Sequence, residues 1–105
     1  MIRPLQIRQT QVFARWYAGL RDTRAKAHIV ARLDRLSLGH IGDAKSVGSG
    51  VSELRIHYGP GYRLYFTRVG EQLVLLVCGG DKTSQRADIA QAHKLVAAWE
   101  PDDDA

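Results

Sequence analysis

Basic and titratable side chains are concentrated around a predicted β-hairpin in the second half of the sequence. In the segment VSELRIHYGPGYRLYF, residues 51–66, apolar and polar residues alternate on either side of Gly-Pro-Gly. Side chains on a strand point to opposite faces with a period of two, so the polar residues are expected to share one face. This polar set comprises Arg55, His57, Arg63 and Tyr65, and Lys82 is expected at the end of the next strand. Such a surface is suited to a phosphodiester.

These residue types suit cleavage of RNA without a metal ion. In that reaction the ribose 2′-hydroxyl attacks the adjacent phosphorus, which requires a base, an acid and cations to hold the developing charge. Arg55 and Arg63 are candidate cations because a guanidinium binds phosphate with a planar fork and stays charged. Lys82, just before an expected helix N-terminus, adds a second type of cation. His57 is a candidate base or acid, and the alternative is a histidine exposed at the end of the hairpin.

The turn determines which residues face each other across the hairpin. We expect a three-residue loop, Gly59-Pro60-Gly61, because glycines at both ends tolerate positive φ. This loop sets His57 opposite Arg63 and Arg55 opposite Tyr65. A two-residue loop would instead bring Arg55 onto the apolar face.

Further residues near the hairpin are candidates for contacting RNA. Lys45, before the hairpin, and Arg86, in the first turn of the last helix, are expected to bind phosphates without reading the base sequence. Tyr65 is a candidate for stacking on a base or donating a proton, and the alternative is cross-strand packing beside Arg55. Glu53 shares this face and is expected to form an ion pair with an arginine rather than to act as a base.

Several other classes of site are not expected. The single cysteine, Cys78, excludes an internal disulfide and a thiolate metal cluster, and its apolar surroundings predict a buried thiol. The histidines are dispersed, so no metal site is predicted. No glycine motif for binding nucleotide phosphates is present, and we expect no cofactor.

The length of 105 residues, with 45% hydrophobic and 25% charged residues, predicts one domain over residues 1–100 and a frayed acidic tail over 101–105. Neither a membrane span nor a signal peptide is predicted, so the expected location is the cytoplasm. Residues 1–38 contain eight basic and two acidic residues, a net charge of +6. This charge favours polyanions as partners, and the alternative is that these cations only solvate helix faces.

The sequence pattern predicts an α+β fold with the order strand, two helices, four strands and a helix. The sheet is expected to be mostly antiparallel, with four to five strands, helices on one face and the polar set on the other. Thr10 is a predicted N-cap of the first helix. The expected segments are a strand at 2–7, helices at about 10–20 and 22–38, a weak strand at 41–47, the hairpin, an apolar strand at 72–78 buried on both faces, and a helix from about 84 to 100.

Taken together, the segments ELRIHYGPGYRLYF, LLVCGGDKTSQ and DIAQA resemble the RelE/ParE toxin superfamily, most closely its phage Gp49-like branch of HigB-like addiction module killer proteins. The resemblance covers nearly the whole chain, including RWYAGLRD. It implies a small RelE-like sandwich and a toxin of a type II toxin-antitoxin system that cleaves mRNA on the ribosome. It also implies that no metal or cofactor takes part, and that a protein antitoxin, expected to be of the helix-turn-helix type, silences the toxin.

By this resemblance, Arg63 matches the position that stabilises the scissile phosphate, and Lys82 matches a basic position. Some members of the superfamily use a tyrosine or histidine near the C-terminus, but this chain has no tyrosine after Tyr65, and His93 lies well inside the last predicted helix. The general acid and base therefore remain open. Two alternatives are a ParE-like gyrase-inhibiting toxin, which needs no catalytic groups, and a catalytically inactive binding module of the same fold.

Overall fold

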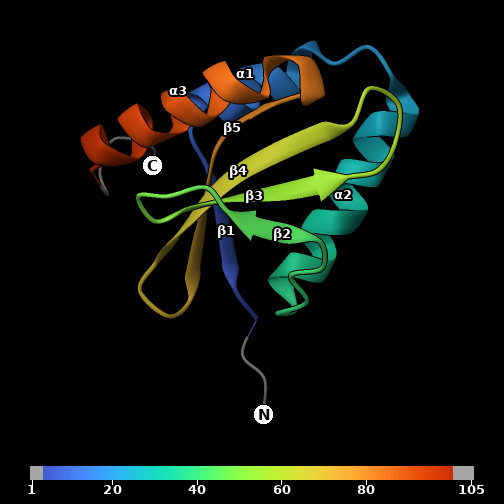
Figure 1. The fold of residues 1–105 in the computed structure, drawn as a ribbon. Coiled ribbons are helices and arrows are strands. Elements are labelled where there is room, and N and C mark those ends of the chain that lie inside the picture. The colour runs from blue at the N-terminus through green and yellow to red at the C-terminus, as the bar shows by residue number, and fades with distance from the viewer. Residues whose placement is uncertain (1–3, 101–105) are drawn as a thin grey trace.

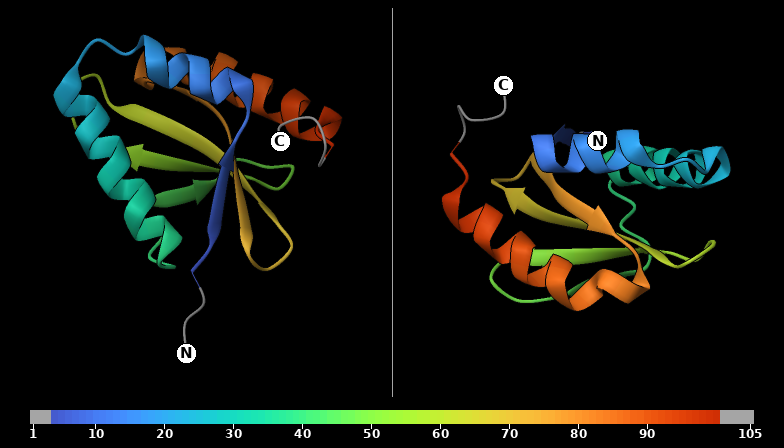
Figure 2. Two further views of the ribbon diagram at one scale, coloured as in Figure 1. Left: turned by 180° about the vertical axis from the view of Figure 1, so that it is seen from behind. Right: turned by 90° about the horizontal axis from the view of Figure 1, so that it is seen from above.

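The computed structural model describes residues 4–100 as a mixed five-stranded sheet with helices on both faces (Figures 1 and 2). The strands lie side by side in the order β1-β5-β4-β3-β2. β1 pairs in parallel with β5, and the other pairs are antiparallel. The strands are β1 (Gln6–Gln9), β2 (Ala44–Ser46), β3 (Val51–Ile56), β4 (Tyr62–Val69) and β5 (Leu73–Gly80). The helices are α1 (Gln11–Gly19), α2 (Thr23–Ser37) and α3 (Gln85–Ala98), and a 3-10 turn, η1 (Lys82–Ser84), precedes α3.

The predicted ends of the first two helices are confirmed by their capping contacts. The Thr10 hydroxyl accepts a hydrogen bond from the Phe13 N–H at 3.1 Å and so caps α1. The Asp22 carboxylate accepts from two N–H groups in the first turn of α2. α2 ends at Ser37, and Gly39 follows the C-cap residue Leu38 with a φ of +90°, which suits a glycine at this position after a helix.

The α+β class is confirmed, but the expectation that the helices cover one sheet face is wrong. Phe13 of α1 and Ile29 of α2 pack on one face, whereas Ala92 of α3 packs on the opposite face. Figure 2, seen from above, shows the sheet between these two layers. The buried strand predicted at 72–78 lies at Leu73–Gly80, with Val74–Gly80 buried without interruption, and a strand buried on both faces needs cover on each side. α3 provides the second cover.

Two glycines at the end of β5 allow helices to approach the sheet closely. A Cβ on Gly79 would fall inside the Trp16 ring of α1, and one on Gly80 would collide with the Asp88 carboxylate of α3. The pair therefore packs tightly between two layers at the point where the chain leaves the sheet for η1.

Two predicted segments extend beyond the described part of the chain. The first predicted strand starts at Ile2, but the structure describes it from residue 4 onward and gives β1 as Gln6–Gln9 at the sheet edge. The acidic tail at 101–105 lies outside the described residues. Within residues 4–100, none of the helices has the length and apolar character needed to cross a membrane.

Candidate phosphate-binding site

The β3–β4 hairpin closes through five residues, His57–Gly61, and not through the predicted three. Ile56 pairs with Tyr62 and Arg55 pairs with Arg63, so the predicted register was wrong by two residues. An even shift leaves each side chain that remains in the two strands on its predicted face. It moves His57 out of the strand and into the loop.

Contacts of Tyr58 with α2 explain the longer loop. The Tyr58 hydroxyl donates to an Asp22 carboxylate oxygen at 3.1 Å, and its ring stacks on His28 with the centroids 4.4 Å apart. The chain therefore leaves the ladder before Tyr58. Gly59 and Gly61, with φ of +58° and +78°, then reverse its direction.

The hairpin loop, β4 and η1 together form an open pocket of about 350 Å³, termed here the hairpin pocket. The hairpin loop and η1 are joined at this pocket, because the Lys82 N–H donates to the Pro60 carbonyl at 3.4 Å. Arg63 reaches into the same loop, since its Nη1 donates to the Gly61 carbonyl at 2.8 Å. None of the described lining residues is acidic. They are His57, Tyr58, Gly59, Pro60, Gly61, Arg63 and Lys82.

The structure thus brings three of the four predicted catalytic residues into one pocket. His57, Arg63 and Lys82 line it, whereas Arg55 lies beside Arg63 across the ladder and is not among the lining residues. The side chain of Arg55 is half-buried, and its backbone carbonyl accepts a hydrogen bond of 2.6 Å from Arg32 of α2. Arg55 therefore supports the pocket from the neighbouring strand.

A fully buried carboxylate, Glu53, holds both arginines. Arg55 Nε donates to Glu53 Oε1 at 3.1 Å, and Arg63 Nε lies 3.7 Å from the same oxygen. Oε2 accepts from the Tyr65 hydroxyl at 3.1 Å and from Gln85 Nε2 at 2.7 Å. These five residues are termed the Glu53 network, and the expected ion pair between Glu53 and a neighbouring arginine is confirmed.

The pKa of Glu53 lies below its ordinary value although the carboxyl is buried. Burial disfavours the charged form, but hydrogen bonds from Gln85, Arg55 and Tyr65 and the positive charge of Arg63 outweigh that effect. The carboxylate is therefore ionised and can balance the two guanidinium groups.

Arg63 is held between the Glu53 carboxylate and the Gly61 carbonyl. Its Nε is buried without a hydrogen-bond partner among the described residues, because 3.7 Å to Glu53 is an ion-pair distance and too long for a hydrogen bond. The side chain as a whole is 12% exposed. Arg63 is thus fixed in orientation with limited access from the pocket.

Tyr65 is buried, so the expectation that it stacks on an RNA base is wrong. Its side chain is fully enclosed in the core beneath α3, and its hydroxyl donates to Glu53. Burial and the neighbouring Glu53 charge raise its pKa above the ordinary value, so the hydroxyl stays protonated. Tyr65 packs across the strand pair, which was the alternative considered, but its partner is Glu53 and not Arg55.

His57 is exposed and pairs with a residue that the sequence pattern did not single out. Its Nε2 forms a hydrogen bond with the carboxylate of Asp43, which directly precedes β2. The hydrogen bond from His57 lowers the pKa of Asp43 despite the small opposing effect of burial. No sequence signal points to Asp43, because its contact with His57 depends on the pairing of β2 with β3.

Asp81 is a second residue that sequence reasoning missed, and it fixes the turn that carries Lys82. Its side chain accepts from the Thr83 N–H at 2.9 Å and the Ser84 N–H at 3.3 Å. Ser84 Oγ in turn accepts from the Asp81 N–H, which completes a capping box. The residues DKTS carry a readable signal for this, namely an N-cap aspartate with a hydroxyl side chain three positions later.

The remaining predicted RNA contacts lie outside the hairpin pocket. Lys45 is exposed on β2 opposite Glu53, and Arg86 is exposed in the first turn of α3. His93 lies elsewhere, with Nε2 2.9 Å from the Val47 carbonyl.

The structure also bears on metal binding and on the reactivity of the cysteine thiol. Within residues 4–100, no group of three or more histidine, cysteine, aspartate or glutamate side chains is placed to hold a metal ion. Cys78 is buried as predicted, and burial together with the Asp88 charge raises the pKa of its thiol to about 12.

The chain is similar in sequence to a bacterial protein. No family model matches the chain, and no solved structure matches it. A protein of Haemophilus influenzae (strain ATCC 51907 / DSM 11121 / KW20 / Rd), described as "Uncharacterized protein", is 50% identical over 91 residues. The match covers 87% of this chain and 92% of that protein. The chain therefore belongs to the same family as this Haemophilus influenzae protein.

Proposed function

We propose that this protein is the toxin of a type II toxin-antitoxin system in the cytoplasm, an endoribonuclease that cuts mRNA on the ribosome without a metal ion. The resemblance of its motifs to the HigB-like branch of the RelE/ParE superfamily suggests this class, and a RelE-like arrangement of the sandwich is part of the proposal. The observation that carries it is the hairpin pocket, in which His57, Arg63 and Lys82 meet.

The two cations would receive the scissile phosphate. Lys82 is exposed on η1, and Arg63 is oriented by Glu53 and by the Gly61 carbonyl. Charged donors fixed before the reaction stabilise the extra negative charge of the pentacoordinate phosphorus without rearranging. Lys45 and Arg86, exposed outside the pocket, would contact flanking phosphates of the mRNA.

His57 would move the proton. When the neutral imidazole donates from Nε2 to Asp43, its Nδ1 is an acceptor that can take the proton of the 2′-hydroxyl. As the 2′-oxygen bonds to phosphorus, the bond from phosphorus to the 5′-oxygen breaks, and the leaving 5′-oxygen takes a proton from solvent. Asp43 acts as a positioning residue in this arrangement, because it selects the tautomer and holds the ring at the entrance of the pocket.

The proposed toxin class also implies which partners the protein binds. The proposed toxin acts on ribosome-bound mRNA and is silenced by a cognate protein antitoxin of the helix-turn-helix type. The net charge of +4 favours association with the ribosome and mRNA, because both are polyanions.

A second candidate function is a catalytically inactive binding module of the same fold. The observation that favours it is the Glu53 network, which explains Arg55 and Arg63 as partners of a buried carboxylate without any RNA. In this case the hairpin pocket would bind an anion without cleaving it.

Induced expression in a bacterium separates these functions. The ribonuclease predicts growth arrest and discrete cuts in a reporter mRNA, mapped by primer extension, that disappear when the reporter's start codon is removed. A gyrase-inhibiting toxin would instead arrest growth with altered plasmid supercoiling and an intact reporter. Good expression without arrest, cleavage or altered supercoiling would favour the inactive binding module.

A further inference from the structure

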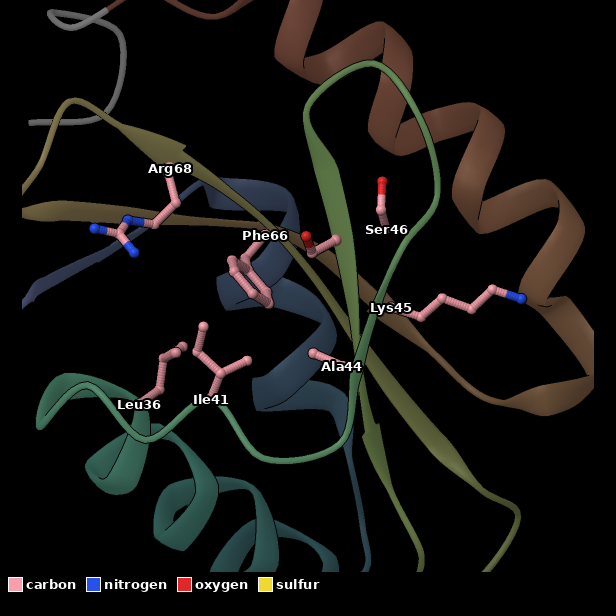
Figure 3. Close-up of a pocket in the computed structure, with 8 residues that line it drawn as sticks. Leu36, Ile41, Ala44, Lys45, Ser46, Phe66 and Arg68 are labelled. Atoms are coloured by element: carbon pink, nitrogen blue, oxygen red, sulfur yellow. The ribbon is translucent and has the colours of Figure 1, made fainter.

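A second hollow, of about 250 Å³, lies where the end of α2 and the following loop meet the open edge of the sheet (Figure 3). Leu36 and Phe66 form its buried apolar part, and Ile41 stands beside them with 42% of its surface exposed. In Figure 3 these side chains converge with Ala44 of β2. The hollow is termed the edge groove, and its other lining residues are Lys45, Ser46, Ser52 and Arg68.

The sheet edge beside the edge groove offers backbone groups for another strand. β2 pairs with β3 on one side and is the outer strand of the sheet. The Asp43 carbonyl accepts from the Arg55 N–H at 3.0 Å, and the Val47 N–H donates to the Val51 carbonyl at 2.9 Å. In an antiparallel ladder, residues whose N–H and C=O groups bond to the partner strand alternate with residues whose groups point away from it. Because Asp43 and Val47 bond to β3, the N–H and C=O groups of Ala44 and Ser46 point away from β3.

We propose that an extended, acidic segment of a protein partner pairs with β2 and fills the edge groove. Successive side chains of an added strand point to opposite faces. One set would enter the apolar groove against Ile41 and Phe66. The alternate set would lie on the opposite face with Lys45, whose side chain points away from the groove in Figure 3. The preferred segment therefore alternates apolar and acidic residues.

The charges around the edge groove favour an acidic partner. The charged residues of the lining are Arg68 and Lys45, the latter with its side chain directed away from the groove (Figure 3), and the described lining contains no carboxylate. Asp43, which directly precedes β2, is outside the described lining, and its carboxylate forms a hydrogen bond with His57. Arg68 donates a hydrogen bond to the backbone carbonyl of Glu71 at 2.8 Å. Because a carbonyl has no net charge, this contact leaves the positive charge of Arg68 without neutralisation.

The same charges disfavour a second copy of this chain as the occupant. A two-fold antiparallel pairing of two β2 strands, centred on the three-residue strand, would set Lys45 opposite its own copy. Like charges directly opposite each other destabilise a strand pair. The proposal does not use the residues of the hairpin pocket, so it stands whether or not the protein cleaves RNA.

The test measures binding of a fluorescein-labelled peptide of alternating valine and glutamate by fluorescence anisotropy. Ser46→Pro removes an outward-pointing N–H while leaving the existing ladder intact, and Ile41→Asp places a charge in the groove. Each variant is expected to weaken binding about tenfold or more, the equivalent of about 1.4 kcal/mol. The matched control for the second is Val30→Asp, at an apolar residue of α2 that is 45% exposed, which should bind like the wild type.

A second measurement locates the peptide. The amide hydrogens of Ala44 and Ser46 should exchange more slowly in its presence, and a peptide of alternating valine and lysine should bind at least about tenfold more weakly. Equal binding of the two peptides, unchanged exchange at β2, or a self-associated chain paired through β2 would each overturn the proposal.

Discussion

Gln85, in the first turn of α3, donates a 2.7 Å hydrogen bond to the buried carboxylate of Glu53 on β3. Gln85 directly follows η1, which carries Lys82. The same carboxylate holds Arg55 and lies 3.7 Å from Arg63 Nε. Glu53 therefore links the three segments that supply cations to the hairpin pocket and its surroundings.

Replacement of Glu53 should strongly destabilise the protein. Glu53→Gln leaves two partly buried guanidinium groups without their counter-ion, and breaking a buried pair costs about 3–5 kcal/mol in other proteins. Because Arg55 is more exposed than Arg63, we expect a loss of about 3 kcal/mol in the free energy of unfolding, measured in urea. Glu71→Gln, at an exposed site, is the control and should change it by less than about 0.5 kcal/mol.

The stability of the wild-type protein should fall in acid in a way that depends on Glu53. Its folded-state pKa is below the unfolded value, so ionised Glu53 stabilises the folded state above the unfolded pKa, about 4.3. That contribution is lost as the pH falls through the lower folded-state pKa. Urea denaturation between about pH 6 and pH 3 should show a steeper loss for the wild type than for Glu53→Gln. Parallel curves would show that another carboxylate dominates.

The thiol of Cys78 should be unreactive in the folded protein. Its pKa of about 12 leaves very little thiolate at pH 8, and the side chain is 1% exposed. A disulfide reagent such as dithionitrobenzoate should modify it rapidly in urea and very slowly in buffer. Rapid modification in buffer would mean that α3 opens readily from the sheet.

Asp43→Asn should lower RNA cleavage while preserving the fold, if the proposed function is right. The amide can still contact His57, but it does not fix the tautomer by charge, so we expect a fall of about tenfold to a hundredfold in cleavage rate. Cleavage of a reporter mRNA in a purified translation system measures this. Asp34→Asn, on the exposed face of α2, is the control and should cleave like the wild type.

Local patterns in the sequence were sufficient to predict the helix cap at Thr10, the start of the second helix near Asp22, the buried β5 strand and the faces of the side chains that remain in the hairpin strands. These features depend on residues close together in the chain. The register was not predictable, because Tyr58 leaves the strand to contact Asp22 and His28, which are distant in sequence. The positions of α3 and Asp43 depend on tertiary packing in the same way, and so the burial of Tyr65 and the His57 partner were missed.

The hairpin pocket as a site of RNA cleavage is tested most directly by one pair of lysine variants. Lys82→Met removes the exposed cation of the pocket, whereas Lys94→Met removes an exposed cation from α3 outside it. Both variants lose one positive charge, so any general effect on ribosome attraction is matched. Primer extension on a translated mRNA should show cleavage by Lys94→Met at the wild-type rate and a fall of about a hundredfold for Lys82→Met. Equal cleavage by both folded variants would contradict the assignment of the pocket.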